Sequence, residues 1–199
     1  MLNTTSDNLT GQRRGSISTL QLVYLAIFTA LVIILQFVSN ITAGILPVPI
    51  TLTLVPIVLA VALNGKWSGA WLGFVFGATV LFSGASEPFF TVNPFGTIVT
   101  VLLKGVLAGL IAGIVYSVFE KKNRYLAIIL AGATAPIVNT GVFIVGCFTF
   151  FYDYVLSLAG GENIFIFIVT VFAGVNFLIE LSVNMLLSPI ILRLINLKK

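Results

Sequence analysis

An acidic residue flanked by two amides inside a long apolar stretch constrains the fold of this chain more than any other feature. The stretch runs from Ile164 to Ile195, and it carries Asn176, Glu180 and Asn184 at spacings of four residues. On a helix, this spacing places all three side chains on one face. Such groups are expensive to bury in a membrane. They are therefore expected to face a bundle interior or a cavity, and to mark a functional site.

The composition places the whole chain in a membrane. Of its 199 residues, 59% are hydrophobic and 8% are charged, whereas soluble domains carry about 25% charged residues. The sequence therefore predicts an integral membrane protein of the all-α class. The apolar run from Leu20 to Val38 is too long for the core of a signal peptide, so we expect it to be retained as the first span.

Turns and charged residues divide the apolar sequence into six predicted spans. Residues 1–17 are expected to form a cytoplasmic tail, and residues 18–199 a single domain, a six-transmembrane-helix bundle. The loops on one side of the bundle are predicted at 40–49, 83–94 and 152–163. The second span is short for a crossing, which needs about 20 residues. The spans are predicted at about 18–39, 50–63, 67–82, 95–119, 125–151 and 164–193.

The charged residues predict the orientation of the bundle. With six spans, every basic residue except Lys104 falls on one side, whereas Glu87, Asp153 and Glu162 fall on the other. The positive-inside rule then places both termini in the cytoplasm. The outer loops are longer and richer in Gly, Pro and aromatic residues, so we expect them to carry recognition.

Small residues repeat every four positions in the third and fourth spans. This spacing lets helix backbones approach closely within lipid, so these two spans are predicted to form a tight pair. Ala26 and Ala30 form a similar pair in the first span. Two accounts of that pair are open, namely packing inside the bundle and a docking face for another membrane subunit. The repeated residues of the third and fourth spans are Gly69, Gly73, Gly77, Gly105, Gly109 and Gly113.

Lys104 and Glu180 are the strongly charged groups predicted to lie well inside the bilayer. Lys104 is about eleven residues into the fourth span, roughly 16 Å deep at 1.5 Å per residue. Thr97 and Thr100 share a compatible helix face with it. Asn139 follows Pro136 in the fifth span. Proline removes a backbone hydrogen bond, so this stretch is expected to form a kinked, polar wall.

Two accounts of these polar groups are open. In the first, Lys104 and Glu180 neutralise each other, and the asparagines satisfy what remains. In the second, the residues line a pocket between the fourth, fifth and sixth spans, where Lys104 binds an anionic group. A pocket that opens outward would reach Asn184 last, so we interpret Asn184 as structural. The candidate ligand-binding residues are Lys104, Asn139, Asn176, Glu180, Asn93, Thr97 and Thr100.

The sequence lacks the patterns that are typical of several functional classes. The chain has no histidine, which argues against a transition-metal site and against a histidine-based enzyme. Its single cysteine, Cys147, permits no intrachain disulfide and is interpreted as a small buried hydrophobe. No phosphate loop or hydrolase motif is present. We therefore predict no catalytic residue, metal, cofactor or nucleic-acid partner, and we expect active transport to draw its energy from partners.

The order of these features resembles the substrate-binding S components of energy-coupling factor (ECF) vitamin transporters. The resemblance implies a multi-pass protein of a bacterial plasma membrane, with a coupling T subunit and two ATPases as partners. It also implies that the T subunit contacts Ala26 and Ala30, and that the ligand pocket opens outward. The resemblance extends from about Leu20 to Arg193 and is carried by YLAIFTALVIILQF, ILPVPITLTLVPIVLAVALNGKWSGAWLGFVFG and NPFGTIVTVLLKGVLAGLIAG.

The ligand implied by the resemblance is a small vitamin, and Lys104 favours an anionic one. The stretch APIVNTGVF is most similar to pantothenate-type members, and pantothenate has a carboxylate, an amide and hydroxyls. Folate, pyridoxine-type vitamins and riboflavin stay open. Two rival classes also stay open: a self-sufficient secondary transporter in which Glu180 couples to protons, and an assembly subunit without a ligand. Riboflavin would need aromatic stacking, for which the candidates are Phe89, Phe90, Phe95, Phe143 and Trp71.

Overall fold

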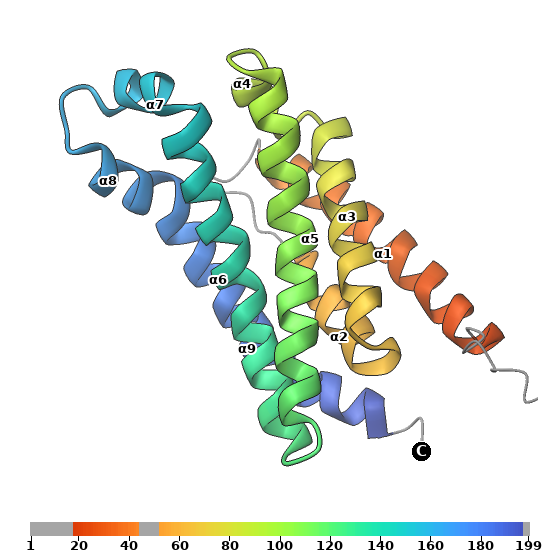
Figure 1. Cartoon of the computed structure of the whole chain (residues 1–199). Coiled ribbons are helices and arrows are strands. Elements are labelled where there is room, and N and C mark those ends of the chain that lie inside the picture. The colour runs from red at the N-terminus through yellow and green to blue at the C-terminus, as the bar shows by residue number, and fades with distance from the viewer. Residues whose placement is uncertain (1–17, 44–51, 197–199) are drawn as a thin grey trace, which may run out of the picture.

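The computed structural model describes residues 18–43 and 52–196, and every regular element in these ranges is helical (Figure 1). The all-α prediction is therefore confirmed. The predicted tail at 1–17 and the segment 44–51, which holds most of the first outer loop, lie outside the described residues. The elements are α1 (Thr19–Ala43), α2 (Leu54–Asn64), α3 (Lys66–Phe82), α4 (Glu87–Phe90), α5 (Pro94–Phe119), α6 (Arg124–Phe150), α7 (Tyr152–Ala159), α8 (Ile164–Phe167), the π-helical η1 (Ile168–Gly174) and α9 (Val175–Asn196).

Helix ends follow local sequence signals. Gly65 adopts a φ of 88° between α2 and α3, a conformation that glycine tolerates without strain, so the chain turns in the gap predicted between the second and third spans. Two predicted loops contain helices, so the loop prediction was wrong at α4 and α7. Pro88 occupies the first turn of α4, where its missing N–H would have no helical partner. Val155 and Ala159 bury one face of α7.

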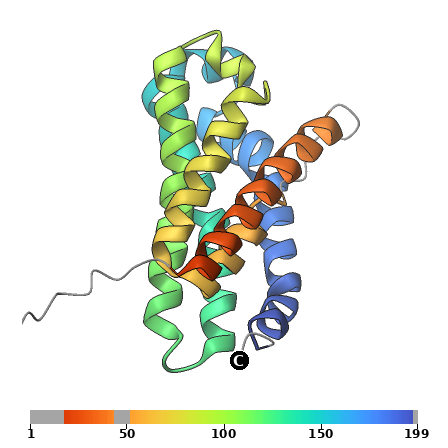
Figure 2. The same ribbon diagram turned by 90° about the vertical axis from the view of Figure 1, so that its right-hand side faces the viewer.

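The centre of the bundle is α2. Leu54, Ile57, Val58 and Val61 are fully buried, and α2 contacts α1, α3, α5, α6 and α9. A helix that is apolar on all sides is stable only in an interior position. Its 11 residues are far fewer than the 20 or so that a full crossing needs. Figure 2 shows α1 lying obliquely across the outside of this core.

Three of the described helices are long and apolar enough to cross a membrane, by length and composition: α1, α5 and α6. The segments 152–159 and 164–171 are bent by 89° and would count as a fourth span if taken together. With 17 residues, α3 is shorter than these spans. The six-span count and the cytoplasmic placement of the termini therefore stay predictions.

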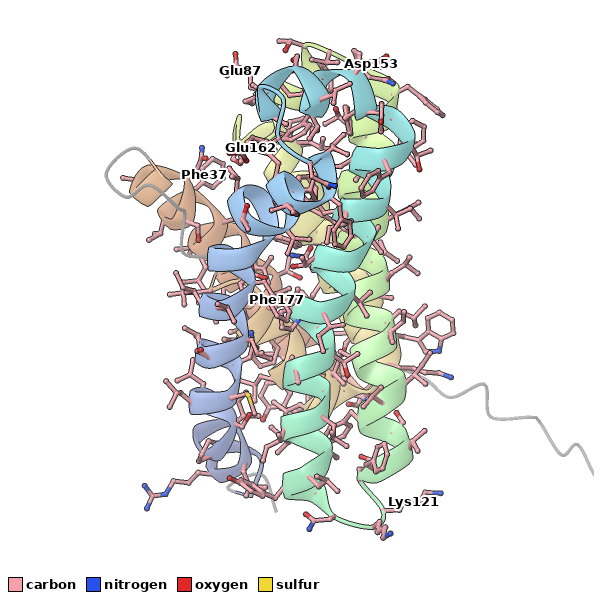
Figure 3. The ribbon with its side chains drawn as sticks, turned by 90° about the vertical axis from the view of Figure 1, so that its left-hand side faces the viewer. Phe37, Glu87, Lys121, Asp153, Glu162 and Phe177 are labelled. Carbon is pink, nitrogen blue, oxygen red and sulfur yellow. The ribbon has the colours of Figure 1, made fainter. Side chains whose placement is uncertain are left out.

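Charged residues lie at opposite ends of the bundle (Figure 3). Glu87, Asp153 and Glu162 lie at the end that carries α4 and α7, which we call the acidic end. Lys121 lies at the other end, in the turn between α5 and α6, which we call the basic end. For these four residues, the structure shows the separation of acidic from basic side chains that the sequence predicts.

Helices α3 and α5 meet backbone to backbone. A Cβ atom built on Gly69 would overlap the carbonyl oxygen of Gly109, and one on Gly73 would overlap that of Gly105. Only residues without a side chain permit this approach. The predicted tight pair of the third and fourth spans is therefore confirmed.

Candidate functional site

Lys104 lies in α5 between aromatic rings of two other helices. Its ammonium nitrogen is 5.3 Å from the ring centre of Phe143 in α6 and 6.0 Å from that of Phe76 in α3. Each ring face attracts the cation by roughly 0.5–2 kcal/mol. Phe76 lies three residues beyond Gly73, and Lys104 precedes Gly105. The glycine contact between α3 and α5 therefore sets how closely Phe76 approaches Lys104.

Glu180 brings the opposite charge from α9. Its side chain is 0% exposed, and its carboxylate attracts the ammonium of Lys104 across the bundle. The thiol of Cys147 in α6 also lies within electrostatic range of Lys104, and its side chain is fully buried. The structure thus brings the two predicted charges into one region, bounded by α3, α5, α6 and α9.

Two buried oxygen atoms lie one helical turn from this charged region. Asn139 precedes Phe143 by four residues on α6, and Thr100 precedes Lys104 by four residues on α5. Asn139 is 6% exposed and Thr100 is 4% exposed. Within the described part of the chain, Asn139 Oδ1 and Thr100 Oγ1 have no hydrogen-bond partner. An unpaired buried polar group costs about 1–3 kcal/mol, so among the described residues these two atoms lack a partner that would offset their burial.

Asn93 and Thr97 already have partners in the structure. Asn93 is the N-cap of α5, and its Oδ1 accepts a hydrogen bond of 2.9 Å from the backbone N–H of Gly96. Thr97 Oγ1 donates to the carbonyl of Asn93 at 2.9 Å. These contacts stabilise the start of α5. Asn93 and Thr97 therefore have a structural role, which the sequence analysis did not predict.

The polar face of α9 continues beyond the predicted three residues. Asn184 Nδ2 donates to the carbonyl of Glu180, and Ser188 Oγ donates to the carbonyl of Asn184, both at 2.8 Å. A Cβ atom on Gly132 of α6 would lie 3.6 Å from Asn184 and Ser188. These contacts support the structural interpretation of Asn184. Asn176 belongs to α9, but its side chain is outside the described residues.

An aromatic cluster extends from Lys104 to the acidic end. Phe89 of α4 makes edge contacts with Phe143, Phe151 and Tyr154, at ring-centre distances of 5.5, 5.0 and 5.7 Å. We call these four residues the aromatic plug. Edge-to-face pairs of this kind contribute about 0.5–1.5 kcal/mol beyond their buried area. The other stacking candidates, Phe90, Phe95 and Trp71, are exposed instead.

Ala26 and Ala30 are exposed and line a groove on the outside of the bundle. The groove is shallow, with a volume of about 440 Å³. The alanine pair is thus not explained by packing inside this chain. The lining residues are Leu22, Leu25, Ala26, Thr29, Ala30, Ile33 and Trp71.

The sequence analysis did not assign several residues to these arrangements, among them Ser188, Phe76 and Cys147. Ser188 continues the four-residue spacing of the polar face, and this signal was available. Phe76 and Cys147 belong to helices that are rich in aromatic and apolar residues. No local pattern separates them from ordinary packing residues.

Among the described residues, no group of three or more His, Cys, Asp or Glu side chains is placed to hold a metal ion.

The comparisons with known proteins place the chain in a family. Searches among curated proteins and among solved structures found no significant match. A family model described as "ECF transporter, substrate-specific component" matches residues 20–192. The chain therefore belongs to the family of substrate-specific components of ECF transporters.

Proposed function

We propose that this chain captures a small anionic vitamin, with pantothenate as the first candidate, for an ATP-driven ECF importer. The observation that carries the proposal is the position of Lys104. Its ammonium lies between Phe76 and Phe143 inside an apolar bundle, and Glu180 is the opposite charge that attracts it. A charged group is costly at such a depth and usually marks a functional site.

The surrounding groups match the chemistry of such a ligand. Lys104 would bind the carboxylate, because an ammonium is a donor only. Asn139 Oδ1 is an acceptor without a partner among the described residues, so it would accept a hydrogen bond from a ligand hydroxyl or amide. Thr100 Oγ1 would donate or accept. The ligand would enter from the acidic end, past the aromatic plug, and Glu180 would balance the charge of Lys104 when the site is empty.

The energy for uptake would come from a coupling T subunit and two ATPases. The exposed groove at Ala26 and Ala30 supports this assembly, because small residues let a partner helix approach closely in lipid. Both alanines face away from the chain's own core. In this proposal, the groove is where the T subunit docks.

A ligand test begins with the purified wild-type chain. Mass spectrometry of co-purified small molecules identifies the candidate. A thermal-shift panel with pantothenate, riboflavin, folate and pyridoxine then measures selectivity. We expect stabilisation by a vitamin that carries a carboxylate. No shift with any vitamin, and no co-purified small molecule, would contradict the proposal.

Two charge variants separate ligand binding from simple neutralisation. Lys104→Met alone leaves the buried Glu180 without its cation, whereas Lys104→Met with Glu180→Gln keeps the bundle neutral. We expect the double variant to fold, yet to bind the vitamin about 10- to 100-fold more weakly, since a hydrogen bond to a charged group contributes about 1.5–3 kcal/mol. Lys66→Met, an exposed lysine at the start of α3, is the control. Wild-type affinity in the double variant would reduce Lys104 to a neutralising role.

A docking test uses the exposed alanines. Ala26→Leu with Ala30→Leu fills the groove, so we expect assembly with the T subunit and ATPases to be lost while vitamin binding persists. Ile27→Phe adds bulk at a neighbouring exposed position outside the groove, and it should assemble normally. Parallel loss of vitamin binding and assembly in the alanine variant would indicate that the alanines serve the fold.

A further inference from the structure

One side of the groove at Ala26 and Ala30 is formed by α3, whereas the rest of the groove is formed by α1. Six of its seven lining residues belong to α1, and the seventh is Trp71 of α3. The Trp71 side chain is 47% exposed. The groove therefore has a floor that includes Ala26 and Ala30 and a side formed by an indole ring.

A chain of two hydrogen bonds fixes the orientation of this ring. Trp71 Nε1 donates to Thr29 Oγ1 at 3.2 Å, and Thr29 Oγ1 donates to the carbonyl of Leu25 at 2.7 Å. Thr29 lies between the two alanines in sequence and also lines the groove. The polar edge of the indole is thus satisfied inside the chain, which leaves its apolar surface available to a partner.

Trp67, one turn earlier on α3, provides a comparison. It is 72% exposed, and Lys66 Nζ lies 5.8 Å from its ring centre. A tryptophan beside a lysine near the basic end is typical of a side chain at the membrane–water interface. Trp67 does not line the groove. Trp71 lies one turn farther from that end, and its N–H is bonded to protein, so it differs from an interfacial anchor.

We propose that Trp71 is an anchor residue for a transmembrane helix of the T subunit, and that Thr29 positions its ring. This inference rests on the proposed function and adds α3 to the docking face. Tryptophan is enriched among the few residues that dominate binding energy. The α1 stretch from Leu22 to Ile33 is roughly 16 Å long at 1.5 Å per residue. That length suits about three turns of a partner helix with a small or β-branched apolar face.

The test measures how much T subunit co-purifies with each variant of the full chain, when the T subunit and the ATPases are co-expressed. We expect Trp71→Ala to reduce recovery at least tenfold. Trp71→Phe and Thr29→Val, which remove the hydrogen bond but keep most of the volume, should give intermediate losses. Trp67→Ala is the matched control and should recover wild-type amounts. Vitamin binding by each variant, expressed alone, reports whether the chain is folded.

The outcomes separate this inference from the proposed function. If the wild-type chain recovers no T subunit, the proposed function is wrong, and the inference with it. If the wild type assembles and Trp71→Ala matches it, only the inference is wrong. Equal losses for Trp67→Ala and Trp71→Ala would assign both rings to lipid anchoring and would overturn the role of Trp71. If Trp71→Ala loses vitamin binding, that variant is not folded, and Trp71→Phe and Thr29→Val take its place in the test. Wild-type recovery of the T subunit by both of these variants would then overturn the inference.

Discussion

The ammonium nitrogen of Lys104 lies 5.3 Å from the centre of the Phe143 ring, so a cation of α5 rests on an aromatic face of α6. This contact joins the charged region to the aromatic plug, because Phe143 also packs against Phe89. A ligand that binds Lys104 must therefore share or displace the ring contact. The charge and the ring are expected to act as one unit in both stability and binding.

A double-mutant cycle between Lys104 and Phe143 measures this unit directly. Phe143→Leu keeps an apolar side chain but removes the π face. We expect the destabilisations of Lys104→Met and Phe143→Leu to be non-additive by about 0.5–2 kcal/mol, the range of a cation–π contact. Thermal or denaturant unfolding in detergent gives the four values. As a control, Phe95→Leu at an exposed ring should be additive with Lys104→Met, and additivity at Phe143 as well would refute the contact.

The glycine contacts of α3 and α5 predict a sharp difference between two similar substitutions. Gly73→Ala places a methyl group against the carbonyl of Gly105. It should destabilise the chain by about 1–3 kcal/mol, as overpacking does. It should also weaken vitamin binding, because Phe76 and Lys104 flank this contact. At Gly141 of α6 a Cβ would meet nothing within 4 Å, so Gly141→Ala should be neutral or slightly stabilising. Unfolding midpoints that fall equally in both variants would contradict the close approach.

Substitutions at Asn93 and Asn139 should affect different properties, namely stability at Asn93 and vitamin affinity at Asn139. Asn93→Ala removes the N-cap of α5 and should lower the unfolding free energy by about 1 kcal/mol without changing vitamin affinity in the folded chain. Asn139→Leu removes a buried oxygen that has no partner among the described residues. It should cost little stability and reduce vitamin affinity severalfold. Vitamin titration and unfolding are measured on the same preparations. If Asn93→Ala weakens vitamin binding and leaves stability unchanged, Asn93 contacts the ligand.

The aromatic plug should control access to Cys147, the single cysteine of the chain. Cys147 is fully buried and packs with Phe151, a member of the plug. Phe89→Ala removes the ring that contacts the other three plug residues. Alkylation of Cys147 by a small maleimide should therefore become faster, and bound vitamin should slow it again. Phe90→Ala, at a neighbouring exposed ring, should leave the rate unchanged, and a rate that is unaffected by Phe89→Ala would show that the plug does not limit access.

Much of the fold was predictable from the sequence because the constraints are local. Glycine spacing and the turn at Gly65 each follow from a short pattern, and the structure agrees with both. The predicted span 164–193 is instead divided into α8, the π-helical η1 and α9. The helices α4 and α7 were missed because their segments contain turn residues and aromatics. Their helical form depends on packing against α5 and α6, which no local pattern reveals.

The sequence named the charged residues of the candidate site, together with Thr100 and Asn139, but not the aromatic rings around them. Lys104 and Glu180 are conspicuous because charge is rare in an apolar chain. Phe76 comes to Lys104 from another helix, and this proximity depends on the backbone contact at Gly73 and Gly105. The sequence left the role of Asn93 ambiguous, because an amide before a helix serves equally well as a cap or a ligand contact. The hydrogen bond from Gly96 shows the capping role, and the ligand contact of Asn93 stays a prediction.

The most direct test of the central claim is vitamin uptake into proteoliposomes, measured with the chain alone and with the chain assembled with its T subunit and two ATPases. The account predicts that the chain alone binds the vitamin but accumulates none. It also predicts that uptake appears only with the complete assembly and ATP. ATP-independent uptake by the chain alone, abolished by Glu180→Gln, would contradict the account and identify a self-sufficient transporter.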